Sequence, residues 1–178
     1  HSLTAGLLFD NTLRDKSSLN RQGIYSVLSA EFTPRWLGND VLGLSDYWRL
    51  SLIVTGYQPV LDSPGLSIYL AERVMFDRIF GDQVPVSTLG SIGALTKVPI
   101  GSNPLRALGG ALRGVYKNRY DGYVKLVANF DVRLHFPDLT LFKLATPMAV
   151  AYFDAGVHDR MTGRLQFDPV YCATGLGV

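Results

Sequence analysis

The sequence lacks the features that define several common protein classes. It has a single cysteine, Cys172, in 178 residues, which excludes an internal disulfide framework. Its 17 Lys and Arg residues nearly balance its 15 Asp and Glu residues, so net charge does not favour a nucleic-acid partner. No apolar run approaches the roughly 18 consecutive residues of a membrane-spanning helix.

The chain is nevertheless apolar. Hydrophobic residues make up 47% of it, and its mean hydropathy is positive, which is high for a soluble domain. Two architectures accommodate such a composition without a spanning helix. One is a soluble domain with a well-filled core, and the other is a transmembrane β-barrel, in which alternation hides the apolar residues.

Alternation of apolar and polar residues is the dominant pattern. In segment 123–136 every even position is apolar and most odd positions are polar or charged, which predicts a strand. At about 3.3 Å per residue this strand would extend roughly 45 Å, enough to cross a bilayer at a tilt. Glu72 breaks the apolar face of segment 66–80. Similar alternation occupies segments 3–9, 24–32, 47–57, 66–80, 145–157 and 170–178.

These segments predict an all-β, antiparallel, up-and-down sheet of about seven to eight strands and no helix. One connection is much longer than the others. Residues 81–122, between strands 66–80 and 123–136, show no sustained alternation and are rich in Gly, Pro, Ser and Leu. Structureless loops longer than about 15 residues are uncommon in compact domains and are usually functional or disordered. We treat residues 1–178 as a single β-barrel segment and expect the loop to fold into its lumen.

Two features favour a transmembrane barrel over a soluble β-sandwich, although alternation alone fits both. The polar faces of successive strands carry large, mixed charged and tyrosine side chains, as a hydrated lumen would. Aromatic residues also gather near strand ends, as in an interfacial girdle. These aromatic residues are Tyr47, Trp48, Phe80, Tyr120, Tyr123, Phe136 and Phe142.

Five short motifs occur in order along the chain. They are residues 6–15 with Gly23, residues 109–114 followed by 118–122, residues 128–133, residues 152–156 and residues 174–178. In this order they resemble an early hairpin, a V-R-G-F/Y loop and three later strand motifs of the BamA/TamA superfamily of outer-membrane assembly barrels. This superfamily is also known as the bacterial surface antigen family. The resemblance is to the C-terminal barrel portion and implies a transmembrane barrel, here a partial one.

The motif loop and the strand at 152–156 predict a contact. Alternation places Tyr152, Asp154 and Gly156 on the polar face, so a loop folded into the lumen would bring Arg113 toward Asp154. A guanidinium can meet a carboxylate bidentately and can lie on an aromatic ring. Gly114 would allow a tight turn, and Gly156 would leave room on the wall. The predicted latch motif comprises Leu112, Arg113, Gly114, Val115 and Tyr116.

The sequence departs from the family at two positions. Val115 stands where the family has an aromatic residue after Arg-Gly, with Tyr116 one place further on. Asp131 stands where the family has Glu, on the same strand face as Asn129 and Arg133, which we also place in the lumen. These three residues form the predicted lumen-face strand.

The resemblance implies a non-enzymatic function, namely insertion of β-barrel proteins into the outer membrane or transport across it. The implied partners are outer-membrane lipids, including lipopolysaccharide, unfolded β-barrel client proteins, and periplasmic POTRA domains or accessory proteins. Because a complete family barrel has more strands, the chain is expected to be a fragment, with a miniature barrel as the alternative. Rival functions are a passive pore or the membrane anchor of a fused patatin-like phospholipase, and a soluble ligand-binding barrel is third.

No catalytic, cofactor or metal site is predicted. The three histidines are far apart in the sequence, Cys172 has no evident base partner, and no Gly-x-Ser-x-Gly motif is present. One further reading stays open for the loop, because Gly109 and Gly110 with Arg113, Lys117 and Arg119 could cradle a phosphate.

Overall fold

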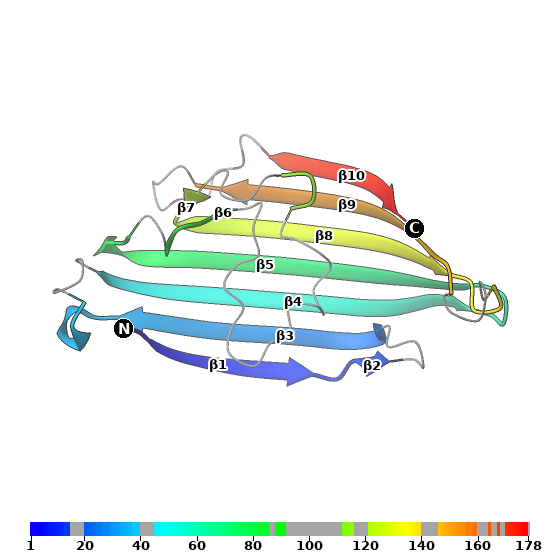
Figure 1. The fold of residues 1–178 in the computed structure, drawn as a ribbon, viewed down its shortest axis with the longest axis horizontal. Helices are drawn as coiled ribbons and strands as arrows, with labels where there is room; N and C mark the ends of the chain where they lie inside the picture. The colour runs from blue at the N-terminus through cyan, green and yellow to red at the C-terminus, as the bar shows by residue number, and fades with distance from the viewer. Residues whose placement is uncertain are drawn as a thin grey trace.

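The computed structural model describes residues 1–14, 20–39, 45–85, 88–91, 112–115, 121–139, 146–159, 164, 167 and 170–177. They form an antiparallel β-sheet with almost no helix, as the alternation predicts (Figure 1). The main strands, in spatial order, are β1 (Leu3–Asp10), β3 (Asn20–Thr33), β4 (Asp46–Asp62), β5 (Ser67–Gln83), β8 (Val124–His135), β9 (Met148–His158) and β10 (Tyr171–Gly177).

Four short elements accompany the main strands. β2 (Leu13–Arg14) pairs with the start of β3, and β6 (Gly90–Ser91) pairs with β7 (Asp121–Gly122) near the base of the long connection. A 3-10 turn, η1 (Arg35–Leu37), follows β3. None of these was expected from the sequence, because two or three residues are too few to show a period. Within the described segments, no helix has the length and apolarity needed to span a membrane.

The seven main strands form a meander, in which each strand pairs with its neighbour along the chain. The long connection does not break this order, because β5 and β8 pair directly over twelve residue pairs from Ser67↔His135 to Arg78↔Val124. Strands β3, β4 and β5 run further than the alternation suggests, whereas β8 and β10 are slightly shorter. β4 and β5 each have 17 residues, longer than the usual strand.

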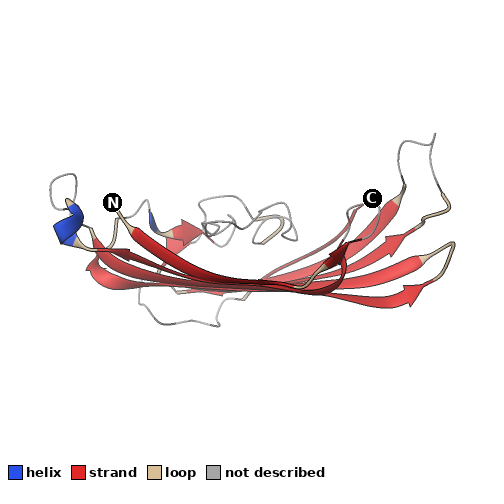
Figure 2. Ribbon diagram, turned by 90° about the horizontal axis from the view of Figure 1, so that it is seen from below, coloured by secondary structure: helices blue, strands red, loops and turns tan. Residues whose placement is uncertain are grey.

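The sheet is curved, and it is not closed (Figure 2). β1 and β10 form its two edges (Figure 1). The short β6–β7 ladder and residues 112–115 lie in the hollow on the concave side of the sheet (Figure 2). The described part of the 81–122 loop therefore lies against the sheet's inner face, as expected for a loop that folds inward.

The polar face of the sheet is the buried one, and the apolar face is the exposed one. On the concave face many buried side chains are polar or charged, including Arg49, Arg73, Asp77, Lys125 and Asp154, each at most 4% exposed. The convex face instead exposes large apolar side chains. These are Leu3, Leu7, Phe9, Ile24, Leu28, Trp48, Leu50, Val74, Phe80, Phe130, Phe153 and Leu176.

An aromatic row crosses the convex face near one end of the strands. The strand register places Phe32 beside Trp48 and Trp48 beside Phe80. The Phe32 and Trp48 rings stack with centroids 4.1 Å apart, and the Arg78 guanidinium lies 4.4 Å from the Phe80 ring centroid. The expectation for Tyr47 is wrong. It shares this strand end, but it points to the concave side and packs there with Ile79 and Leu89, because neighbouring residues in a strand face opposite ways. Tyr120 and Phe142 lie outside the described residues.

Candidate functional site: a loop turn on the concave face

A four-residue turn, Leu112–Val115, is the part of the long loop that contacts the sheet. The backbone N–H of Val115 donates to the Leu112 carbonyl oxygen at 3.4 Å, and Gly114 has a φ of 78°. A positive φ at the third turn residue is what a type II turn requires, and glycine adopts it without steric cost. The tight turn expected at Gly114 is confirmed.

Leu112 anchors the turn in an apolar patch of the concave face. It is 1% exposed and packs with Met75 and Val127, which the β5–β8 register places side by side. Gly156 is the next residue in that row, and a Cβ built on it would lie 3.6 Å from Leu112 Cδ2, an ordinary contact distance. Gly156 therefore lies beneath Leu112. Val115 packs against the same cluster, so an aliphatic side chain completes the contact of the turn with the sheet.

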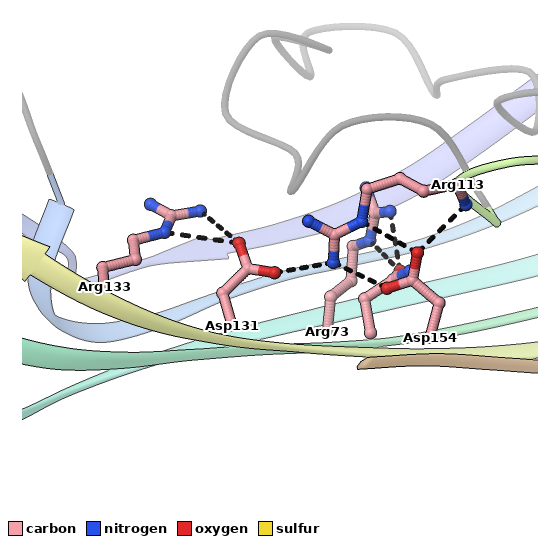
Figure 3. A network of polar contacts seen from close by, with 6 residues as sticks. Arg73, Arg113, Asp131, Arg133 and Asp154 are labelled. Atoms are coloured by element: carbon pink, nitrogen blue, oxygen red, sulfur yellow. Dashed lines mark hydrogen bonds and ion pairs between the residues drawn. The ribbon is translucent and has the colours of Figure 1, made fainter. Parts of the chain in front are cut away.

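Arg113 binds the strand wall through two carboxylates (Figure 3). Its Nε donates to Asp154 Oδ2 at 2.8 Å and its Nη2 donates to Asp154 Oδ1 at 2.6 Å, which is a bidentate contact. The Arg113 backbone N–H also donates to Asp154 Oδ2, at 3.0 Å. The same Nη2 donates to Asp131 Oδ1 at 2.6 Å. The Arg113–Asp154 contact expected from the sequence is present, and Asp131 is an additional partner.

The surroundings of Arg113 favour its charged form. Its guanidinium carbon lies 3.8 Å from the centroid of the Tyr152 ring, a cation–π distance. Asp154 is fully buried, whereas the Arg113 side chain is 21% exposed. Burial alone would lower the pKa of Arg113, but the hydrogen bonds that it donates to Asp154 and Asp131 outweigh this effect and hold the pKa above its ordinary value. The turn thus carries a permanent positive charge into a site lined by carboxylates.

A wider polar network supports the two carboxylates (Figure 3). Arg133 donates from Nη2 to Asp131 Oδ2 at 3.0 Å. Arg73 donates from Nε and Nη2 to Asn129 Oδ1 at 2.9 and 2.7 Å, and Asn129 is hydrogen-bonded to Asp154. The predicted lumen-face residues of β8 are therefore all part of the site. Arg73 was not predicted, although it lies on the polar face of segment 66–80.

A second buried cluster on the concave face was missed entirely. Arg49 donates to Asp77 from Nε and Nη2, each at 2.8 Å, and Ser51 Oγ donates to Asp77 Oδ1 at 2.7 Å. Lys125 Nζ lies 3.0 Å from Asp77 Oδ2. The register places Asp77 directly between Ser51 and Lys125. Alternation puts each of these residues on the polar face, but only strand pairing shows that they meet.

Several other candidate residues cannot be placed on the sheet. Gly109, Gly110, Lys117 and Arg119 of the phosphate-cradle hypothesis lie outside the described residues, as does Tyr116 of the latch motif. Among the described residues there is no group of three or more His, Cys, Asp or Glu side chains that could hold a metal ion.

The two described histidines of the sheet lie at the ends of β8 and β9. His135 is buried at the end of β8, and the His158 ring stacks on that of Tyr171 with centroids 5.6 Å apart. Cys172 is exposed on the edge strand β10.

No protein-family model matches this chain. Searches of curated proteins and of solved structures likewise find no match. The functional argument therefore depends on the motifs and on the geometry of the sheet.

Proposed function

We propose that this chain is part of an outer-membrane β-barrel protein of the assembly or translocation type. In this proposal the convex face contacts lipid, the concave face is the lumen wall, and the Leu112–Val115 turn latches the long loop to that wall. The protein would help to insert unfolded β-barrel clients into the outer membrane, or to transport them across it. Its activity would be non-enzymatic, and POTRA domains or accessory proteins would deliver the clients.

The exposed apolar convex face is the observation that supports a membrane location. Leaving a large apolar side chain in water costs about 1.5–3 kcal/mol relative to burying it. The twelve convex-face side chains are between 37% and 86% exposed, so leaving them in water forgoes on the order of 10–20 kcal/mol of burial free energy. A hydrocarbon environment removes this cost, and extended apolar patches of this kind mark membrane or protein contacts. The aromatic row with Arg78 fits one border of such a band.

The buried charges of the concave face favour an assembly-type barrel over a passive pore. A water-filled channel would leave its lining charges accessible, whereas Asp154, Asp77 and Lys125 are at most 2% exposed. The Arg113 contacts hold the loop turn directly over this surface. A membrane anchor for a fused hydrolase, such as a patatin-like phospholipase, would fit the same sheet and is the second candidate.

The membrane orientation is tested by tryptophan fluorescence in liposomes that contain brominated acyl chains. The chain has two tryptophans, so Trp36→Phe leaves Trp48 alone on the convex face. We expect strong quenching of Trp48. The matched control moves the indole by one residue with Tyr47→Trp and Trp48→Phe, which places it on the concave side, and should be quenched little. Equal quenching at both positions would overturn the proposed orientation.

The activity is tested by reconstitution of the protein into liposomes. We expect an unfolded outer-membrane β-barrel substrate to fold faster in these liposomes than in empty ones, and we expect Arg113→Ala to reduce this gain. An ion conductance without any folding gain would favour the pore. Release of fatty acids by the full-length protein would favour the hydrolase anchor. Either result without a folding gain would refute the assembly function.

A further inference from the structure

A polar site centred on Glu72 interrupts the apolar convex face. Strand β5 carries two charged residues on this face, namely Arg78, which lies over the Phe80 ring, and Glu72, whose side chain is exposed. Gln58 Nε2 donates to Glu72 Oε1 at 3.0 Å. Within the described part of the chain, no basic side chain pairs with Glu72. Charged side chains that face lipid are unfavourable and rare, so such a residue points to a function.

A cavity opens beside this carboxylate. Its volume is about 680 Å³, within the range of about 300–1,000 Å³ typical of small-molecule sites. The hollow depends on Gly56, which pairs with Glu72 across β4 and β5. A Cβ at Gly56 would lie 3.0 Å from Glu72 Oε1 and 3.1 Å from its Cγ, so any side chain there would displace the carboxylate.

The lining of the cavity is divided between polar and apolar residues. The polar ones are Asn11, Gln22, Gln58 and Glu72, together with Arg73 and Asn129, whose buried side chains bind each other in the concave-face network. The apolar ones are Ile24, Val54, Val74, Ala128, Phe130 and Phe153. Asn11 directly follows β1, so the polar part borders the β1–β2 end of the sheet, while Phe130 and Phe153 extend the apolar part across β8 and β9. The cavity therefore suits a molecule with a polar head and an apolar tail.

The position of the site along the strands fits the second border of the apolar band. Glu72 lies eight residues from Phe80 of the aromatic row, both on β5. Eight residues span about 26 Å along a strand, or about 20 Å of depth at the usual tilt of barrel strands. The apolar band of an outer-membrane barrel is about 25 Å tall. If the aromatic row lies at one border of the apolar band, Glu72 lies close to the other border, beside the headgroups of the other leaflet.

We propose that this cavity binds a phospholipid whose headgroup carries a primary ammonium, of the phosphatidylethanolamine type. The inference depends on the membrane location proposed above. The ammonium donates to the Glu72 carboxylate and the Gln58 side-chain oxygen, and an acyl chain lies along Val74 and Phe130. A choline headgroup has no N–H to donate, and an anionic headgroup is repelled by Glu72. The N–H groups of the headgroup ammonium are what select this lipid over a choline lipid, and the absence of net negative charge is what selects it over an anionic one.

The test uses the intact protein in nanodiscs of phosphatidylcholine and phosphatidylglycerol with added phosphatidylethanolamine. Native mass spectrometry then measures which lipids the protein retains. We expect the protein to retain phosphatidylethanolamine over phosphatidylcholine by about tenfold. Glu72→Gln, which keeps the shape of the side chain, should abolish the preference, and Gly56→Ala should weaken binding of both lipids. The control Asp46→Asn removes a surface carboxylate at the opposite end of β4 and should retain the preference.

Each result has a definite meaning. Equal retention of the two lipids by a protein that has entered the bilayer would overturn the lipid site and leave the membrane location standing. A protein that stays in the aqueous phase would overturn both. Displacement of the lipid by soluble phosphoethanolamine would also refute the lipid assignment, because it would mean that the apolar half of the cavity contributes no binding. Loss of the preference in both Glu72→Gln and Asp46→Asn would refute a local role for Glu72.

Discussion

Removal of the Arg113 side chain should release the loop turn from the sheet. Arg113→Ala deletes three guanidinium hydrogen bonds, two to Asp154 and one to Asp131, together with the contact on Tyr152. Breaking a buried ion pair on one side typically costs about 3–5 kcal/mol, because it leaves the other charge uncompensated. Asp154 keeps some compensation from Asn129 and the nearby charge of Arg73, so the lower end applies.

A cost of about 3 kcal/mol changes the ratio of docked to undocked turns by about a hundredfold. The assay uses a cysteine beneath the turn. Val127 is 3% exposed and lies under Leu112, so Val127→Cys in a Cys172→Ala background is accessible to a maleimide only when the turn lifts. When redocking is faster than the reaction, the labelling rate follows the undocked population.

We expect Arg113→Ala to raise the labelling rate by about a hundredfold in liposomes. The matched control is Arg133→Ala, which removes another guanidinium from Asp131 but is not in the turn, and we expect its effect to stay below about threefold. If the labelling rate of Arg113→Ala stays within about threefold of the rate of the parent protein, Arg113 does not hold the loop on the sheet and the reasoning fails. An equal rise in both variants would mean that the whole sheet has loosened.

Two further changes test the surrounding structure. Asp77→Asn leaves two buried cations without their carboxylate and should lower the free energy of unfolding by about 3–5 kcal/mol in a urea titration. Asp46→Asn, in an exposed ion pair, should lower it by no more than about 1 kcal/mol, and equal effects would contradict the burial argument. Gly114→Ala forces an alanine to a φ of 78° and should make docking of the turn less favourable by about 1–2 kcal/mol. We expect this change to raise the labelling rate of Val127→Cys about tenfold. An unchanged rate would mean that the turn can relax without leaving the sheet.

Much of the fold could be predicted from local alternation. A strand places successive side chains on opposite faces, so the period of two in segment 123–136 predicts both β8 and the side chains that share its polar face. The same reasoning located Glu72 as an exception, whereas the tight turn was predicted from the loop motif and from the glycine at position 114. It could not give strand ends, because β4 continues past Tyr57 to Asp62 through residues that no longer alternate.

What only the tertiary structure decided is which residues meet across strands and which face is covered. Asp77 contacts Arg49 on one neighbouring strand and Lys125 on the other, and a shift of register by one residue would send one partner to the opposite face. Alternation puts Tyr47 and Trp48 on opposite faces, but only the packing of Ile79 and Leu89 on Tyr47 shows that the residue on the polar face is the buried one. Alternation by itself shows that one face is apolar and the other polar. Only the packing of Leu112 and Arg113 on the polar side shows that the chain covers its charges and leaves its apolar face outward.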